Sequence, residues 1–303
     1  MTLFWILFII GLIFFLLLDL GVFHKENKAV SLKSAFYWTF FWFIAATCFG
    51  IGVYFFVSPE KCLEFATGYL LEQSLSIDNI FVFVLLFKRF RIPAKYQYRV
   101  LYWGVFGALI MRALMIFLGI ELLNQFEWMI YVFGAFLIYT GIKMLFAMPS
   151  EDDIGEHAVL KWMRKHFNIT KELHEEKFFV RVDSKLYLTP LFIVLLLIEI
   201  TDLIFAFDSI PAILAITRDP FIVYTSNCFA ILGLRSLYFV LAKMVDRFKL
   251  LHYGLGIVLA FVGFKMIASH FFELPIWFTL GFIVVVLTAS VLLSLMTTKP
   301  VKD

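Results

Sequence analysis

The segment DNIFVF, residues 78–83, recurs as DLIFAF at residues 202–207, and each copy lies inside a long apolar run. Both copies follow the pattern D-x-I-F-x-F. An aspartate inside a membrane-crossing run is costly, and it is retained where it is paired, faces water or binds a substrate. The repeated segment therefore indicates a membrane protein built from two related halves.

The composition also indicates a membrane protein. The 303 residues are 62% hydrophobic and 16% charged, whereas soluble domains carry about 25% charged residues. A bilayer core of ~30 Å needs ~20 apolar residues for each crossing helix. Runs of this kind cover residues 3–22, 35–57, 64–87, 100–122, 127–147, 188–216, 221–242, 252–271 and 275–297. The first run lacks a basic start and a small-residue cleavage site, so we expect it to be a retained span.

The match between the two halves continues after the aspartates. Arg112 in the fourth span corresponds to Arg235 in the seventh, and the fifth and eighth spans carry G-x-K-M around Lys143 and Lys265. Each unit has three spans, an odd number, so the second unit must enter the membrane from the opposite face. Such inverted repeats are typical of secondary transporters, whose substrate sites lie near the bilayer midplane.

We therefore expect an all-α polytopic membrane helix bundle with nine transmembrane helices and a 3+3 inverted-topology repeat of spans 3–5 and 6–8. A single domain covers residues 1–303. Repeat one spans about 63–147 and repeat two about 188–271; a cytoplasmic loop at 148–187 joins them, and the ninth span is 275–297.

The loops predict the orientation. Lys and Arg cluster in alternate loops, and the opposite loops hold only Lys61 and Arg218. The positive-inside rule then puts the N-terminus outside and the C-terminus in the cytoplasm. Because the basic residues form short clusters between apolar spans, they give no support to nucleic-acid binding.

Nine charged residues fall inside the expected spans. The acids are Glu72, Asp78, Glu199, Asp202 and Asp208, and the bases are Arg112, Arg235, Lys143 and Lys265. An unpaired charge at the bilayer centre costs ~2.5–3.5 kcal/mol. Nine would cost roughly 25 kcal/mol, more than a typical folding stability of ~5–15 kcal/mol. They must therefore pair with one another, face the bundle interior, or contact water or substrate.

Some of these charges are expected to form structural ion pairs. Arg112 and Arg235 are the candidates to neutralise two carboxylates, since a guanidinium binds a carboxylate in a bidentate manner. Lys143 and Lys265 lie toward helix ends and can instead extend to the interface.

The remaining acids suit a metal ion. Asn79 and Ser209 add neutral oxygens beside two of them, and Pro211 is expected to break or kink the sixth span and release backbone carbonyls. An oxygen-only set favours a hard divalent cation such as Mn²⁺, Mg²⁺ or Ca²⁺ over Cu⁺ or Zn²⁺. The candidate metal ligands are Glu72, Asp78, Asn79, Glu199, Asp202, Asp208 and Ser209.

Other chemistries lack a motif. The three cysteines, Cys48, Cys62 and Cys228, form no C-x-x-C pair, and no P-loop pattern is present for ATP-driven pumping. We expect no enzyme activity and no tightly bound cofactor.

Long stretches resemble the TerC family of membrane proteins. They are FATGYLLEQSLSIDN at 65–79, EITDLIFAFDSIPA at 199–212, DPFIV at 219–223 and AILGLR at 230–235. The resemblance implies a protein of the bacterial inner membrane that is linked to Mn²⁺ export, alkaline response and, for some members, tellurite resistance. It also carries the acidic residues of these stretches over as functional positions.

We therefore expect a secondary transporter that exports a divalent metal, Mn²⁺ above all, through a midplane carboxylate site. Protons are the expected coupling ion, because moving a divalent cation out against an inside-negative potential requires an opposing flow. The alternatives are a non-transporting membrane scaffold or a redox modulator linked to metal or tellurite resistance. The oligomeric state is left open.

Overall fold

The computed structural model describes residues 2–23, 31–146, 162–163, 165–170, 173–182, 185–242, 250–269, 271 and 274–297. Within these residues the chain forms long helices and one small hairpin. The helices are α1 (Thr2–Phe23), α2 (Leu32–Phe56), α3 (Pro59–Arg89), α4 (Ala94–Gln125), α5 (Met129–Phe146), α7 (Pro190–Leu214), α8 (Pro220–Leu241), α9 (Leu251–Ala268) and α10 (Ile276–Thr297), and the strands are β1 (Phe179–Val182) and β2 (Lys185–Leu188).

The expected all-α membrane architecture is confirmed at this level. Seven of these helices, α2, α3, α4, α5, α7, α9 and α10, are long and apolar enough to cross a membrane. The helix α8 lies outside this set, although it has 22 residues. Its polar side chains, among them Asn227 and Arg235, are buried. Because other helices surround these side chains, α8 can lie inside the bundle with a less apolar sequence.

Short polar caps set where several helices begin. Ser58 precedes Pro59, and its hydroxyl accepts a hydrogen bond from the Lys61 amide at 3.1 Å. Asp219 precedes Pro220 in the same way and accepts from the Phe221 amide at 3.0 Å. A capping oxygen followed by proline satisfies a free amide and fixes a helical φ at the first turn.

The helix α7 continues through Pro211 and ends at Leu214. The break expected there is therefore wrong. Pro211 lies in the last turn, where a missing amide donor removes only one hydrogen bond before the helix ends.

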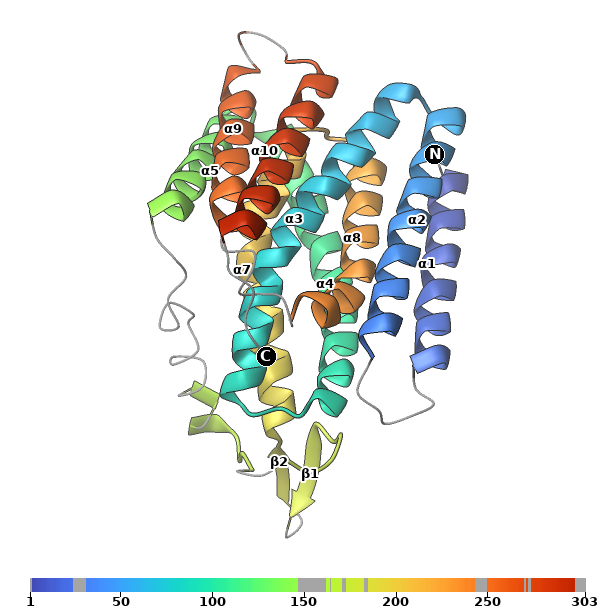
Figure 1. Cartoon of the computed structure of the whole chain (residues 1–303), viewed down its shortest axis with the longest axis vertical. Coiled ribbons are helices and arrows are strands. Elements are labelled where there is room, and N and C mark those ends of the chain that lie inside the picture. Colours follow the sequence, from blue (N-terminus) through green and yellow to red (C-terminus); the bar gives the residue numbers. More distant parts are fainter. Residues whose placement is uncertain are drawn as a thin grey trace.

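Four long helices, α3, α4, α7 and α8, pack around one another at the centre of the bundle. The helices α1 and α2 lie on the α8 side, whereas α5, α9 and α10 form a layer on the opposite side (Figure 1). The central helices therefore lie in the interior of the bundle, where a charged side chain can have polar partners.

The helices α5 and α9 approach each other through glycines. A Cβ on Gly141 would lie 2.5 Å from the Gly256 carbonyl oxygen, and one on Gly263 would lie 2.6 Å from that of Gly134. Only glycine permits backbones this close. The two contacts are reciprocal: in each one, a glycine near the start of one helix faces a glycine near the end of the other.

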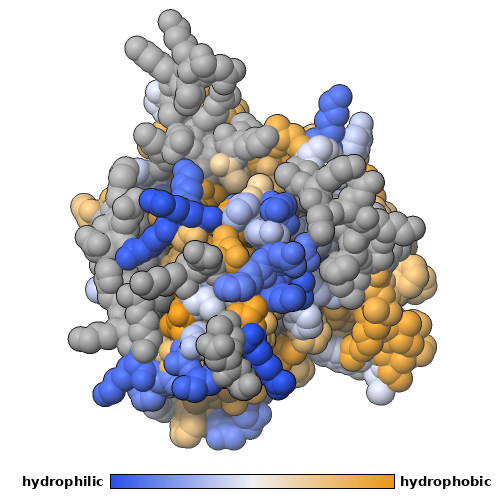
Figure 2. Space-filling view, turned by 90° about the horizontal axis from the view of Figure 1, so that it is seen from below, coloured by the Kyte–Doolittle hydropathy of each residue, from blue (hydrophilic) through white to orange (hydrophobic). Residues whose placement is uncertain are grey.

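The chain between α5 and α7 contributes an element that we did not predict. Strands β1 and β2 pair antiparallel, with Phe179 opposite Leu188, and they project beyond the helices (Figure 1). We call this end of the molecule the hairpin face. Hydrophilic side chains gather on it (Figure 2), and Lys88, Arg89, Arg91 and Lys95 are exposed where α3 ends and α4 begins. Within the expected loop at 148–187, the described residues are 162–163, 165–170, 173–182 and 185–187.

Candidate functional site

Arg112 is the centre of a buried polar cluster that joins four helices. Its side chain is 3% exposed. Its Nη1 donates to Glu72 Oε1 of α3, to Ser209 Oγ of α7 at 2.9 Å and to Asn227 Oδ1 of α8 at 2.8 Å. The pair with Glu72 is a salt bridge whose carboxylate side chain is 2% exposed. A charge removed from water is stable only with such partners, so Arg112 and Glu72 depend on each other.

Asp202 adds a second carboxylate to the cluster. It is the middle residue of α7 (Pro190–Leu214) and is 5% exposed. Its Oδ1 accepts a hydrogen bond from Asn79 Nδ2 at 3.0 Å, and it lies within the electrostatic fields of Arg112 and Glu72. Arg112 thus contacts one of the two carboxylates, that of Glu72, and Asn79 holds the other.

Asn79 contributes a buried acceptor to the cluster. The side chain is 2% exposed, and its Oδ1 has no hydrogen-bond partner among the residues that the structure describes. A buried polar atom without a partner costs about 1–3 kcal/mol. An oxygen retained at that cost beside two carboxylates fits a site that holds a cation or a water molecule in part of its working cycle.

Glu199 lies one turn from Asp202 on α7 and is half-buried. Its carboxylate occupies the space over Gly107 of α4, where a Cβ would overlap it. Asp202 acts on it electrostatically. Glu199 is therefore close to the cluster and packs against α4, the helix that carries Arg112.

Asp208 and Ser209 are neighbours in the sequence but face different helices. Ser209 binds Arg112, whereas Asp208 Oδ1 accepts from Thr140 Oγ1 of α5 at 3.1 Å. Lys143, in the last turn of α5, acts on Asp208 electrostatically. Asp208 thus belongs to a separate contact between α7 and α5.

Asp78 is also separate from the cluster. Its Oδ2 lies 3.5 Å from Nδ1 of His252, in the first turn of α9. Both side chains are partly exposed, at 15% and 16%. The first residues of the two D-x-I-F-x-F segments thus have different surroundings, because Asp78 faces α9 and Asp202 faces Asn79.

The other two bases expected in the spans are buried. The Arg235 guanidinium lies over the ring of Tyr98, 4.6 Å from its centroid, and 5.9 Å from that of Tyr102. Lys265 is 9% exposed and interacts electrostatically with Glu64. The expected carboxylate partner is therefore observed for Arg112. The Arg235 guanidinium is packed over aromatic rings.

The seven candidate metal ligands are therefore divided among several places. Glu72, Asn79, Asp202 and Ser209 come together, and Glu199 adjoins them. Among the residues that the structure describes, no three His, Cys, Asp or Glu side chains are close enough to hold a metal ion. A metal in this conformation would depend on the neutral oxygens, and the ligand role of all seven stays a prediction.

Three contact residues were not anticipated from the sequence: Asn227, His252 and Thr140. Asn227 follows Thr225 and Ser226 inside an apolar run. That polar triplet is a signal that could have identified it. His252 and Thr140 have no comparable signal, because each is a single polar residue near a helix end or within an apolar run.

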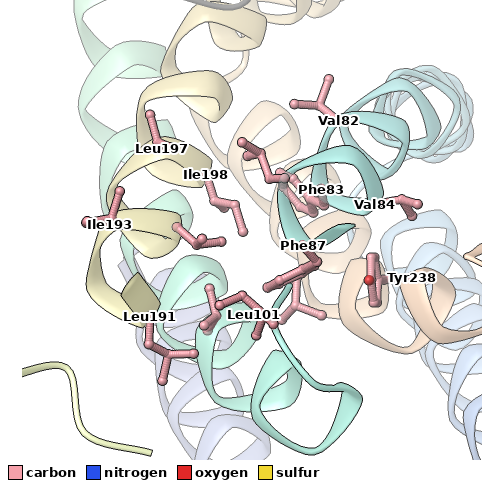
Figure 3. Close-up of a cluster of buried hydrophobic side chains, with 14 of the residues drawn as sticks. Val82, Phe83, Val84, Phe87, Leu101, Leu191, Ile193, Leu197, Ile198 and Tyr238 are labelled. Atoms are coloured by element: carbon pink, nitrogen blue, oxygen red, sulfur yellow. The ribbon is translucent and has the colours of Figure 1, made fainter. Parts of the chain in front are cut away.

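Apolar side chains enclose the cluster on both sides. Toward the hairpin face, Phe83 and Phe87 of α3, Leu101 of α4 and Ile198 of α7 gather between the helices (Figure 3). Toward the opposite face, Leu71, Ile213 and Val223 belong to a second buried apolar group. The cluster is therefore occluded from both faces.

A cavity of about 1210 Å³ opens at the end opposite the hairpin face. Lys61 lines it and lies 2.8 Å from Glu64 Oε2 and 3.6 Å from Asp219 Oδ2. Below it, Gly68 packs closely on Ile213, where a Cβ would lie 2.8 Å from Ile213 Cδ1. The cavity thus ends above the apolar layer that covers the cluster.

Similar proteins are found in several bacteria. The chain is 48% identical to an uncharacterised membrane protein, STKORF319, of Myxococcus xanthus, over 96% of this chain and 91% of that protein. It is 43% identical to a protein of Photorhabdus laumondii over 97% and 95%, and 44% identical to one of Escherichia coli strain K12 over 89% and 87%. The names of the last two describe them, provisionally, as a membrane-bound redox modulator, Alx.

No solved structure matches the chain. Residues 57–302 match the integral membrane protein TerC family, and this range includes the buried cluster and both D-x-I-F-x-F segments. The helices α1 and α2 precede it. The resemblance seen in the sequence is thereby confirmed, and the chain belongs to the TerC family of integral membrane proteins.

Proposed function

We propose that this protein is a secondary transporter that exports a divalent metal, Mn²⁺ above all, in exchange for protons. The observation that carries the proposal is the occluded cluster of Glu72, Asp202, Asn79 and Ser209 at mid-helix positions. Carboxylates are expensive inside a membrane and mark substrate and ion pathways there. Oxygen donors of this kind suit a hard divalent cation.

The helix contacts support an inverted repeat as the frame of this site. If α3–α5 correspond to α7–α9, the packing of α3 on α8 is equivalent to that of α7 on α4, and both occur. The reciprocal Gly141–Gly256 and Gly134–Gly263 contacts follow the same exchange. We propose nine spans, with the hairpin face in the cytoplasm and the N-terminus outside, as the apolar runs and the positive-inside rule predict.

The two apolar layers supply the barriers that such a transporter needs. A site closed on both sides is an intermediate between a form open to the hairpin face and one open to the cavity. In inverted-repeat transporters, one repeat rocks against the other around a fixed site. Here the cavity beside Lys61 would be the outer vestibule that receives the released ion.

Energetics require a coupling ion. Exporting a divalent cation against an inside-negative potential costs about 2 × 2.3 kcal/mol per 100 mV. Protons moving inward can supply this energy, and carboxylates are groups that exchange protons for metal.

The relatives' name favours a second candidate, a redox role. It would need a reactive thiol or another redox group. The three cysteines of the chain are free: Cys48 is exposed, Cys62 is half-buried and Cys228 is buried. Replacing all three with serine or alanine separates the two functions, because metal transport should persist and a thiol-based redox function should not.

Flux into proteoliposomes tests the main proposal. Purified protein would be reconstituted with Mn²⁺-sensitive and pH-sensitive dyes, and Mg²⁺, Ca²⁺ and Zn²⁺ would be run beside Mn²⁺. We expect Mn²⁺ movement with an opposing proton signal, and loss of both in Asp202→Asn. Absence of flux for every cation under an imposed pH gradient would contradict transport and favour a scaffold.

A further inference from the structure

The centre of the proposed site holds a positively charged group of the protein itself, the side chain of Arg112. The Arg112 guanidinium is bound to oxygens of Glu72, Ser209 and Asn227, which come from three other helices. These are a carboxylate, a hydroxyl and an amide oxygen, the ligand types that a hard divalent ion uses. One Nη1 atom thus engages the Glu72 carboxylate that a metal ion at this place would need, and Ser209 and Asn227 help to hold the guanidinium there.

The guanidinium leaves part of the site unfilled. Asn79 donates to Asp202 through Nδ2, and its Oδ1 is buried without a partner in the same cluster. A guanidinium donates through fixed, planar N–H groups, whereas a metal ion accepts ligands from all sides. All three bonds of the guanidinium come from Nη1, so the Asn79 oxygen is an acceptor that the guanidinium does not engage from this position.

We propose that Arg112 is a tethered counter-cation that competes with the transported metal for the carboxylate of Glu72. This inference rests on the proposed function, and it concerns how the same site is regulated. A metal enters only when the guanidinium withdraws from Glu72, and the guanidinium returns when the metal leaves.

Competition of this kind compensates the negative charge of the site when no metal is bound. An empty site without Arg112 would hold two carboxylates with no counter-charge, and uncompensated charges are costly inside a membrane. With Arg112 in place, the emptied carrier keeps a neutralised Glu72 and changes conformation at lower cost. A metal ion and the guanidinium at the same carboxylate repel each other, so in this proposal they alternate.

Binding measurements test the competition without any transport step. Mn²⁺ affinity of the purified full-length protein in detergent would be measured by calorimetry and by the EPR signal of free Mn²⁺. In Arg112→Gln we expect the affinity to rise by about tenfold or more, because a unit positive charge at contact distance is removed. An unchanged or weaker affinity would overturn the proposal.

A second variant covers the case in which Arg112→Gln does not fold. Asn227→Ala removes one oxygen that holds the guanidinium but keeps its charge. If Arg112 competes with the metal, the looser guanidinium is displaced more easily and Mn²⁺ affinity rises by about twofold to tenfold. If Asn227 is instead a metal ligand, the affinity falls, and the proposal is wrong.

Arg99→Gln is the matched control. Arg99 lies on the same helix, α4, and is also paired with a glutamate, Glu176, at 3.1 Å, but it contacts no residue of the cluster. Its replacement should leave Mn²⁺ affinity unchanged. An equal rise in affinity in this variant would mean that the effect of Arg112→Gln comes only from the net charge of the protein, and it would overturn the proposal. If the native protein binds and carries no Mn²⁺, the proposed function itself fails, which is a distinguishable result.

Discussion

Asn79, the second residue of the first D-x-I-F-x-F segment, donates a 3.0 Å hydrogen bond to Asp202, the first residue of the second segment. The two residues lie 123 positions apart in the chain and meet at a buried position between α3 and α7. Among the described residues, the amide oxygen of Asn79 has no hydrogen-bond partner. A hydrogen bond that uses one end of an amide and leaves the other unpaired indicates a site built for a further ligand.

Asn79→Leu tests the role of that amide. The two side chains have similar size, so the packing of α3 should be preserved. We expect Mn²⁺ flux in proteoliposomes to fall by about tenfold or more, because Asp202 loses its donor and the site loses an oxygen ligand. Thermal unfolding in detergent serves as the control for folding, and flux equal to that of the native protein would show that the amide is structural.

Asp78→Asn and Asp202→Asn should each abolish Mn²⁺ flux while the protein still inserts into the membrane. Asp202 belongs to the central cluster, whereas Asp78 lies beside His252. Flux assays on both variants, with insertion checked by membrane fractionation, decide the point. Retained flux in both would exclude these aspartates from the transport path.

Glu72→Gln should lower the stability of the fold. The change leaves the Arg112 guanidinium buried without its salt-bridge partner, and breaking a buried ion pair costs about 3–5 kcal/mol. The double variant Glu72→Gln/Arg112→Gln should recover much of this loss, since no uncompensated charge remains. Denaturant unfolding of the two single variants and the double variant gives the coupling energy, and additive losses would argue against a tight pair.

Gly141→Ala should destabilise the α5–α9 contact. The added Cβ would lie 2.5 Å from the Gly256 carbonyl oxygen and 2.6 Å from the Ala260 amide nitrogen, and overpacking of this kind costs about 1–3 kcal/mol. Gly281→Ala on α10 is the control, because nothing lies within 4 Å of its new Cβ. A control variant as stable as the native protein beside a weakened Gly141→Ala is the expected result in thermal unfolding, and equal stability of both variants would contradict close packing.

Much of the fold follows from local sequence. Apolar runs of bilayer length predict the helices. Their starts were predicted less closely, since the third span was expected from residue 64, whereas α3 begins at Pro59 after the capping residue Ser58. The hairpin of β1 and β2 escaped prediction because each strand has only four residues. The continuation of α7 through Pro211 depended on how close the helix end lay, which the local pattern does not specify.

The sequence by itself determined that this is a helical membrane protein of the TerC family and that its spans carry charges requiring partners. These properties depend on composition and on residues close together in the chain. Only the tertiary structure decided which partners they have. Asp208 and Ser209 are adjacent, yet Asp208 faces α5 and Ser209 faces Arg112. Arg112 and Arg235 are related by the repeat, yet Arg112 contacts a carboxylate and Arg235 contacts aromatic rings. The physical reason is that each pairing depends on how the helices rotate and pack against one another, and residues far apart in the chain determine that packing.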